Sequence, residues 1–161
     1  MTAASSFARA ATAKHPRHLC LKFAATQDGV RSALGDLRGF MQAARIGADA
    51  CGTAEIVMAE ALNNVAEHAY RMSGAGDIEL TVRLTQSAVS ACITDAGAPL
   101  PGLCLPEAEA PLDGSPQDNL PEGGFGWFLI HSLTSALTYR RVDGTNHLAI
   151  EMDLLPASEA R

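Results

Sequence analysis

Residues 55–70, EIVMAEALNNVAEHAY, form the stretch that best predicts the fold and function of this chain. Its apolar side chains recur at helical spacing and make one stripe of Met58, Leu62, Val65 and Ala69. On the same helix a second strip stacks the polar side chains of Glu60, Asn64 and His68. The stretch is therefore predicted to be a helix with one core-facing side and one polar side.

The polar strip has two interpretations. Two asparagines, Asn63 and Asn64, lie mid-helix, although Asn is a mediocre helix former whose side chain competes for nearby backbone groups. Glu60 suits a general base, and the Asn64 oxygen suits a hard cation such as Mg²⁺. The strip thus fits Mg-nucleotide chemistry, but it also fits a solvated polar face with a capping Asn. The helix alone does not decide between them.

Length and composition exclude several classes of protein. The 161 residues suit one domain, and a net charge of −6 argues against a general binder of nucleic acid or anionic membrane. The four cysteines form no C-x-x-C pair, which favours free thiols in a reducing cytoplasm. No apolar run approaches the roughly 20 residues of a membrane span. Residues 1–16 are predicted to be a disordered tail, with a transit-like leader as the alternative, and residues 156–161 are predicted to be a second tail.

Hydrophobic periodicity predicts the remaining elements. The motif helix extends back to about residue 49. The other segments are a strand at 18–24, a helix at 29–46, a strand hairpin at 77–85 and 88–94, a helix at 127–136, and strands at 137–142 and 146–154. The helices cluster instead of alternating one by one with strands. This order favours an α+β protein, a two-layer sandwich, over a doubly wound parallel sheet.

Residues 95–122 have a different character, because they hold six of the chain's eight prolines and almost no periodicity. A loop of this length inside a small domain is commonly a functional lid. Two glycine motifs flank it. Asp95-Ala96-Gly97-Ala98-Pro99 follows a predicted strand, and Gly123-Gly124-Phe125-Gly126 opens a predicted helix. Alone, the first motif also fits an ordinary turn. The second is neither a dinucleotide fingerprint nor a P-loop, since no strand precedes it and no Gly-Lys-Ser/Thr follows.

Together and in this order, E-x-x-x-N-x-x-E-H-A-Y, D-x-G-x-P and G-G-x-G-x-x-L-I resemble the motifs of the Bergerat-fold (GHKL, histidine-kinase-like) ATPases. The ending Glu-His-Ala-Tyr and Pro99 resemble most closely the bacterial anti-sigma-factor serine-protein kinases. The resemblance covers about residues 18–154. It implies a mixed sheet covered on one face by helices, a domain at 17–155, and an ATP lid at about 98–123.

The resemblance also implies a role for each matched residue. Glu60 corresponds to the general base that accepts the proton of a substrate serine, and Asn64 to the ligand of Mg²⁺. Asp95 corresponds to the residue that reads adenine, and Gly97 to its close-approach glycine. The remaining residues expected to contact the nucleotide are His68, Gly124, Phe125, Gly126 and Trp127.

The implied function is an ATP-dependent serine/threonine kinase and anti-sigma factor. Such a protein is expected in the bacterial cytoplasm, uses ATP and Mg²⁺, and phosphorylates a STAS-domain antagonist. It also sequesters a sigma factor or similar client, forms a homodimer, and binds neither nucleic acid nor membrane.

The alternative is a non-catalytic module that sequesters a partner, with weak or structural nucleotide binding. Two features favour it. Residues 100–122 contain five acidic residues and no Lys or Arg, which is an awkward lid over a polyphosphate. Arg31, Arg38 and Arg45 recur every seven residues along one helix and would suit an acidic partner, although they also fit a solvated helix flank.

Overall fold

The computed structural model of the protein describes residues 17–71, 75–108 and 124–154. Both predicted tails, at 1–16 and 156–161, lie outside the described residues, as does residue range 109–123 of the predicted lid. Among the described residues, no helix combines the length and apolar character that crossing a bilayer requires.

The elements follow the predicted order. They are β1 (His18–Ala24), α1 (Gln27–Ala43), α2 (Ala48–Asn64), a π-helical turn (Val65–Ala69), β2 (Asp77–Leu84), β3 (Ala88–Asp95), a short 3-10 turn (Pro101–Leu103), α3 (Gly124–Leu133), β4 (Ala136–Val142) and β5 (Thr145–Asp153). The α+β prediction is confirmed, and so is the β2–β3 hairpin.

The first and last helices differ from the prediction at both ends: they span Gln27–Ala43 in place of 29–46 and Gly124–Leu133 in place of 127–136. The first helix ends at Ala43 and not at Ile46, because Arg45 adopts a left-handed φ of 58° and the Ile46 amide donates to Met41 O at 3.0 Å. The last helix begins at Gly124 and not at Trp127, so Gly124 and Gly126 of the G-G-x-G-x-x-L-I motif lie inside its first turn.

The described strands form one sheet in the order β1-β2-β3-β5-β4. The expectation of a mixed sheet is wrong for these strands, because all four pairings are antiparallel. Two helices separate β1 from β2 and return the chain to the end where β1 finishes. A single helix connects β3 to β4, which makes these strands parallel, but β5 lies between them and pairs antiparallel with both.

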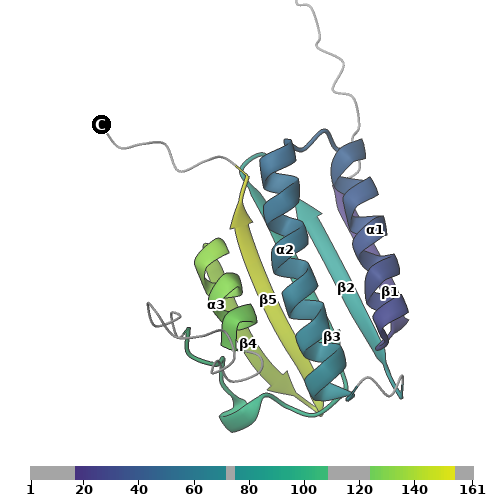
Figure 1. Cartoon of the computed structure of the whole chain (residues 1–161), viewed down its shortest axis with the longest axis vertical. Helices are drawn as coiled ribbons and strands as arrows, with labels where there is room; N and C mark the ends of the chain where they lie inside the picture. Colours follow the sequence, from purple (N-terminus) through teal and green to yellow (C-terminus); the bar gives the residue numbers. More distant parts are fainter. Residues whose placement is uncertain (1–16, 72–74, 109–123, 155–161) are drawn as a thin grey trace, which may run out of the picture.

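The expectation of two layers with helices on one face is confirmed: α1, α2 and α3 cover one face of the sheet, with α2 in the middle (Figure 1). The core lies between these layers. It is built from alternating strand positions and from the inner faces of the helices, including Leu37, Met41, Met58, Leu62, Ile78, Leu80, Val82, Ile93, Ile130 and Ile150. The other sheet face carries charged side chains, among them Lys22, which pairs with Asp77 at 3.7 Å and Glu79 at 3.3 Å.

The motif helix is not one regular α-helix. It changes to π geometry at Val65. A π-helix has more residues per turn than an α-helix, so the side chains from Val65 onward do not continue the predicted apolar stripe. Met58 and Leu62 are fully buried as expected, but Ala66 occupies the next buried position in place of Val65. Val65 and Ala69 are only half-buried and line a cavity, and Val65 also packs against the edge of the core.

Candidate functional site

A cavity of about 470 Å³ lies between the C-terminal part of α2, the start of α3, the C-terminal end of β3 and the N-terminal end of β5. Its volume is in the range of small-molecule sites. The residues that line it include Asn64, Val65, His68 and Ala69 from α2 and the π turn, Asp95, Pro99, Leu100 and Glu107 from β3 and the following loop, Gly124 and Trp127 from α3, and Tyr139, Asn146 and Leu148 from the last two strands.

One wall of the cavity is helical. The Asn64 side chain lines the cavity, and its Nδ2 is buried without a hydrogen-bond partner in the described part of the chain. Glu60 lies one helical turn earlier, and its side chain approaches Gly126 at the start of α3. A Cβ placed on Gly126 would lie 2.6 Å from Glu60 Oε2 and 3.8 Å from Asn64 Oδ1. The carboxylate and the carboxamide oxygen therefore both lie near the first turn of α3, and a side chain at position 126 would require the Glu60 carboxylate to move.

The opposite wall is the end of β3, where Asp95 is 5% exposed. Its Oδ1 accepts hydrogen bonds from Gly97 N at 2.9 Å and Asn146 Nδ2 at 2.8 Å. Within the described residues no donor contacts Oδ2, and Asp95 lines the cavity. One oxygen is thus held by the protein, and the other is available to a ligand.

Asn146 is 4% exposed and connects several elements. Its Nδ2 also donates to Ala98 O at 3.0 Å, and its Oδ1 accepts from the Tyr139 hydroxyl and from Arg141 Nη1, both at 2.7 Å. Arg141 donates further to Gly97 O at 2.9 Å. These bonds tie the loop after β3 to the β4–β5 hairpin.

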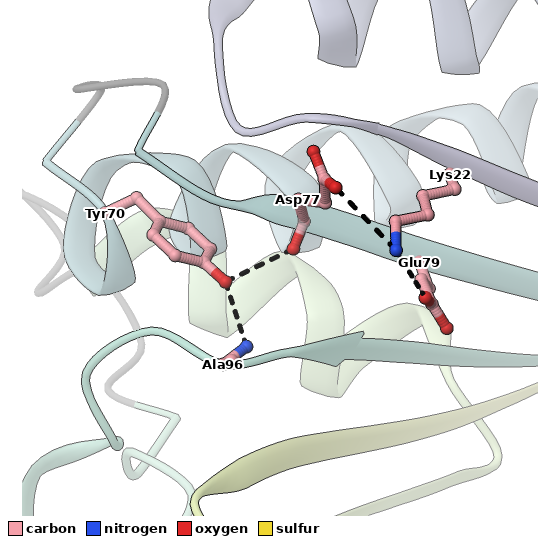
Figure 2. A network of polar contacts seen from close by, with 5 residues as sticks. All are labelled: Lys22, Tyr70, Asp77, Glu79 and Ala96. Atoms are coloured by element: carbon pink, nitrogen blue, oxygen red, sulfur yellow. Dashed lines mark hydrogen bonds and ion pairs between the residues drawn. The ribbon is translucent and has the colours of Figure 1, made fainter.

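Tyr70, just past the π turn, holds the same loop from the other side. Its hydroxyl accepts from Ala96 N at 2.9 Å and donates to Asp77 O at 3.2 Å, as Figure 2 shows. Burial raises the pKa of this hydroxyl, with smaller opposing and reinforcing effects from the Ala96 amide and the Asp95 carboxylate. The hydroxyl therefore keeps its proton at neutral pH and can donate to Asp77.

The π turn also packs directly against the loop. The Ala98 amide donates to Ala69 O at 3.1 Å, and a Cβ on Gly97 would lie 2.6 Å from Ala69 Cβ and 2.8 Å from Ala69 O. The backbone leaves no space at this position, which accounts for a glycine in the D-x-G-x-P motif.

The described start of the predicted lid is attached to α3. Pro106 O lies 2.9 Å from His131 Nε2, which donates to it in the appropriate tautomer. The His131 ring is tilted against Trp127, with centroids 6.3 Å apart. Trp127 is 7% exposed and belongs both to the core and to the cavity lining.

The predicted site residues fall into three groups. Asn64, His68, Asp95, Gly124 and Trp127 meet in the cavity lining, with His68 exposed at its edge. Glu60, Gly97 and Gly126 do not line it but lie behind it, in the contacts described above. Phe125 points away: it is 50% exposed, and its ring stacks on Phe128 with centroids 6.2 Å apart.

Sequence reasoning missed Asn146, Arg141, and the hydroxyls of Tyr70 and Tyr139. A signal for two of them was present. Asn146 is in phase with the apolar positions Leu148 and Ile150 of its strand, and Arg141 is in phase with Leu137. A polar residue at a core-facing strand position needs buried partners. That phase would have placed both side chains on the inner face of the sheet.

The donors present fit one Mg²⁺ shared with a polyphosphate. The described residues contain no group of three or more His, Cys, Asp or Glu side chains able to hold a metal ion. Mg²⁺, however, usually keeps several waters and is held by few protein groups plus substrate phosphates. The Asn64 amide, with its unpartnered buried nitrogen, matches such a sparse site, since its oxygen would face the metal and its nitrogen a phosphate oxygen.

Two solved structures share this fold at 16% identity. An RsbU–RsbW two-domain structure from Mycobacterium tuberculosis superposes with a TM-score of 0.60 over 88% of this chain and 34% of that one. SiaB in the SiaB–SiaC complex of Pseudomonas aeruginosa gives a TM-score of 0.55 over 84% of this chain and 89% of that one. Identity this low shows the likeness of the fold alone.

Sequence comparison is more specific. The serine/threonine-protein kinase BtrW of Bordetella bronchiseptica is 38% identical over 102 residues, which cover 62% of this chain and 68% of BtrW. The serine-protein kinase RsbW of Halalkalibacterium halodurans is 34% identical over 91 residues, 56% of this chain and 55% of RsbW. The model of the histidine kinase-like ATPase domain matches residues 23–152. The chain therefore belongs to the histidine kinase-like ATPase family, and its resemblance to the anti-sigma-factor serine-protein kinases is confirmed.

Proposed function

We propose that this protein is an ATP-dependent serine/threonine kinase that acts in partner switching. Its substrate is a serine or threonine on a STAS-type antagonist, and in the unswitched state it sequesters a sigma factor or similar client. The observation that carries the proposal is the cavity itself, whose lining includes both a half-paired buried carboxylate, Asp95, and Asn64, whose buried nitrogen has no partner among the described residues.

In this proposal the strand wall takes the base of ATP. Asp95 Oδ2 accepts a hydrogen bond from the exocyclic amine of adenine, while Trp127 and Leu148 supply apolar contact. The phosphates extend toward Gly124, at the N-terminus of the ten-residue α3, whose free amides and dipole favour negative charge.

Glu60 is the proposed base. Among the described residues its carboxylate makes no hydrogen bond or ion pair, so its lone pairs are free to accept the proton of the substrate hydroxyl. It lies beside Asn64 at the first turn of α3, close to where the phosphates would end. Phosphoryl transfer depends mainly on positioning and charge neutralisation, and a single well-placed carboxylate suffices for the proton.

When bound, Mg²⁺ would supply neutralisation of the phosphate charge. Asn64 is the protein group that would hold it, together with phosphate oxygens and water. Because the Asn64 amide is neutral, it would hold the metal without placing a second negative charge beside the Glu60 carboxylate.

One observation favours the second candidate, a sequestering module without catalysis. Glu107, in the described start of the predicted lid, lines the cavity, and its charge opposes a polyphosphate. The arginines that would suit an acidic partner support this candidate less, because Arg38 is engaged by Glu55 at 2.6 Å and Arg31 by Asp28 at 3.0 Å.

The two candidates separate in a phosphotransfer assay. The purified protein is incubated with γ-labelled ATP, Mg²⁺ and, in turn, each STAS-domain protein encoded in the same genome. We expect label on a Ser or Thr of one of them, and loss of at least 100-fold in rate for Glu60→Gln with ATP binding retained. Removing a general base typically costs 10²–10⁴-fold.

Glu67→Gln is the matched control, since Glu67 lies on the same helical segment but is exposed and outside the cavity lining. It should transfer label at the wild-type rate. A fully active Glu60→Gln variant would remove Glu60 as the base. ATP binding without transfer to any of the STAS-domain proteins would favour the sequestering module.

A further inference from the structure

Three polar side chains form a row across the sheet where the core should be apolar. Asp95 ends β3 and is paired in register with Asn146 on β5, which is paired in turn with Arg141 on β4. All three belong to the helix-facing side of their strands. The row therefore reads acid, amide, cation over three adjacent strands, and strand register alone brings the groups together.

The amide at the centre of this row is fully used. Asn146 Nδ2 donates to Asp95 Oδ1 at 2.8 Å and Ala98 O at 3.0 Å, and Oδ1 accepts from Arg141 and Tyr139 at 2.7 Å each. A buried polar network of this kind is favourable only when every member is satisfied. Each bond also constrains the next, so the Asp95 carboxylate cannot turn about its own axis without breaking the set.

The charge on Arg141 acts through the amide. Its Nη1 donates to the Asn146 oxygen, which polarises the amide and strengthens the donation from Nδ2 to Asp95. The same guanidinium nitrogen holds Gly97 O at 2.9 Å, so it fixes the loop and the carboxylate together. Tyr139 adds a second anchor, because its hydroxyl accepts from Leu100 N at 3.1 Å.

We propose that Asn146, backed by Arg141 and Tyr139, is a positioning residue that sets which nucleobase this cavity accepts. It occupies Asp95 Oδ1 and leaves Oδ2 directed at the cavity as a pure hydrogen-bond acceptor. An acceptor in a fixed orientation selects a base with an exocyclic amine, as in adenine, over one with a carbonyl there, as in guanine or hypoxanthine. The inference rests on the proposed function, since it assigns the base to the strand wall.

A positioning role and a purely structural role of Asn146 predict different effects on nucleotide binding. If Asn146 only stabilised the sheet, its loss would weaken binding of all nucleotides alike. If it orients Asp95, its loss should weaken ATP selectively and reduce the preference for ATP over ITP. The base-dependent part of affinity is thus the decisive readout.

Asn146→Asp is the sharpest variant, because it keeps the shape of the side chain and replaces the donor by a second acceptor. Two carboxylates then face each other across β3 and β5. The titratable groups that contact this network are Arg141 and Tyr139 on β4 and Tyr70, which reaches the loop through Ala96 N. His68 and Glu107 line the same cavity, and both are unchanged in the variant, so the wild type measured at each pH accounts for their titration. Two adjacent carboxylates share one proton at lower pH, and the shared proton restores a donor between them.

The experiment is calorimetry of the full chain with MgATP and MgITP from pH 5.5 to 8.0. For Asn146→Asp at pH 8.0 we expect at least a tenfold loss of ATP affinity, an ATP-to-ITP ratio close to one, and recovery of both toward pH 5.5. Gln42→Glu makes the same amide-to-acid change on the exposed side of α1, and it should bind like the wild type at every pH.

Each outcome of the calorimetry supports or overturns the positioning role of Asn146. Unchanged ATP preference in Asn146→Asp, or equal loss for both nucleotides at every pH, overturns the positioning role while leaving the proposed function standing. A wild-type protein that binds neither nucleotide overturns both. Tyr139→Phe gives a second reading in a variant that keeps the aromatic core contact, with a smaller, two- to fivefold loss of ATP preference expected.

Discussion

The two walls of the cavity differ in how completely their polar groups are paired. On the strand wall, made by Asp95, Asn146, Arg141 and Tyr139, the buried Asn146 amide has a protein partner for its oxygen and its nitrogen. On the helix wall, where Asn64 lines the cavity and Glu60 and Gly126 lie next to Asn64, the described residues leave Asn64 Nδ2 buried and unpartnered. Among the described residues, the strand wall leaves one oxygen, Asp95 Oδ2, without a partner, whereas the helix wall leaves both the Asn64 nitrogen and the Glu60 carboxylate without one.

This difference distinguishes polar groups that stabilise the fold from polar groups that are available to a ligand. A satisfied network rigidifies and specifies the local structure, whereas an unsatisfied buried group costs free energy until a ligand pairs with it. The strand wall is therefore suited to selecting the ligand, and the helix wall to reacting with it. Variants that treat the two walls identically should give opposite or unequal results.

The largest expected difference in stability is between two Gly→Ala variants, one on each wall. Gly97→Ala sets a Cβ against Ala69 Cβ and the Ala69 backbone oxygen, neither of which can move without displacing the π turn. Overpacking of this kind costs about 1–3 kcal/mol, or a drop of roughly 2–9 °C in melting temperature. Thermal unfolding measures it.

Gly126→Ala is the matched variant on the helix wall, where the new Cβ would clash only with the end of the Glu60 side chain and would be in ordinary contact with Asn64 Oδ1. A flexible carboxylate can turn aside, so we expect little change in melting temperature but slower phosphotransfer. Equal losses of stability in the two variants would contradict the distinction between a rigid and an adaptable wall.

An intermediate effect, of opposite sign on the two walls, is expected from Asn→Leu. In Asn64→Leu the unpartnered amide is removed, which should recover part of the roughly 1–3 kcal/mol that a buried unsatisfied group costs and raise the melting temperature. In Asn146→Leu the partners Asp95, Arg141 and Tyr139 lose their bonds, so the melting temperature should fall.

Binding completes this comparison. Asn64→Leu should lose Mg-dependent ATP affinity while gaining stability, which is the signature of a residue kept for function. A lower melting temperature in Asn64→Leu would mean that the amide has a partner in the folded protein, and the contrast between the walls would fail.

The same contrast explains what could be predicted from the sequence. The helices and strands followed from periodicity, and the candidate residues of the helix wall followed from their spacing on one helix. The strand wall depends on register between β3, β5 and β4, which no local pattern specifies, so Asn146 and Arg141 were read as ordinary strand residues. Likewise, the π turn has no sequence signature in a strong helix, and because of it Ala66 takes the fully buried position while Val65 is half-buried and lines the cavity.

The smallest effect should come from a pair that belongs to neither wall, and it sets the baseline for the others. Glu55, on the same helix as Glu60, accepts two hydrogen bonds from Arg38 of α1, at 2.8 and 2.6 Å. Hydrogen bonding to Arg38, together with its charge, lowers the pKa of Glu55 below its usual value. A lowered carboxylate pKa contributes stability that is present above the ordinary pKa of 4.5 and is lost as pH falls through the lowered value.

Arg38 is 60% exposed, so solvent screening should keep this contribution small. Glu55→Gln should therefore lower the melting temperature by about 1–3 °C at pH 7, by less near pH 3.5, and leave ATP affinity unchanged at both. The comparison is informative because Glu60→Gln, five residues later on the same helix, should do the reverse: it should stop phosphotransfer and leave the melting temperature at pH 7 close to that of the wild type. If both substitutions changed stability alike, Glu60 would be a paired structural carboxylate, and the helix wall would be as complete as the strand wall.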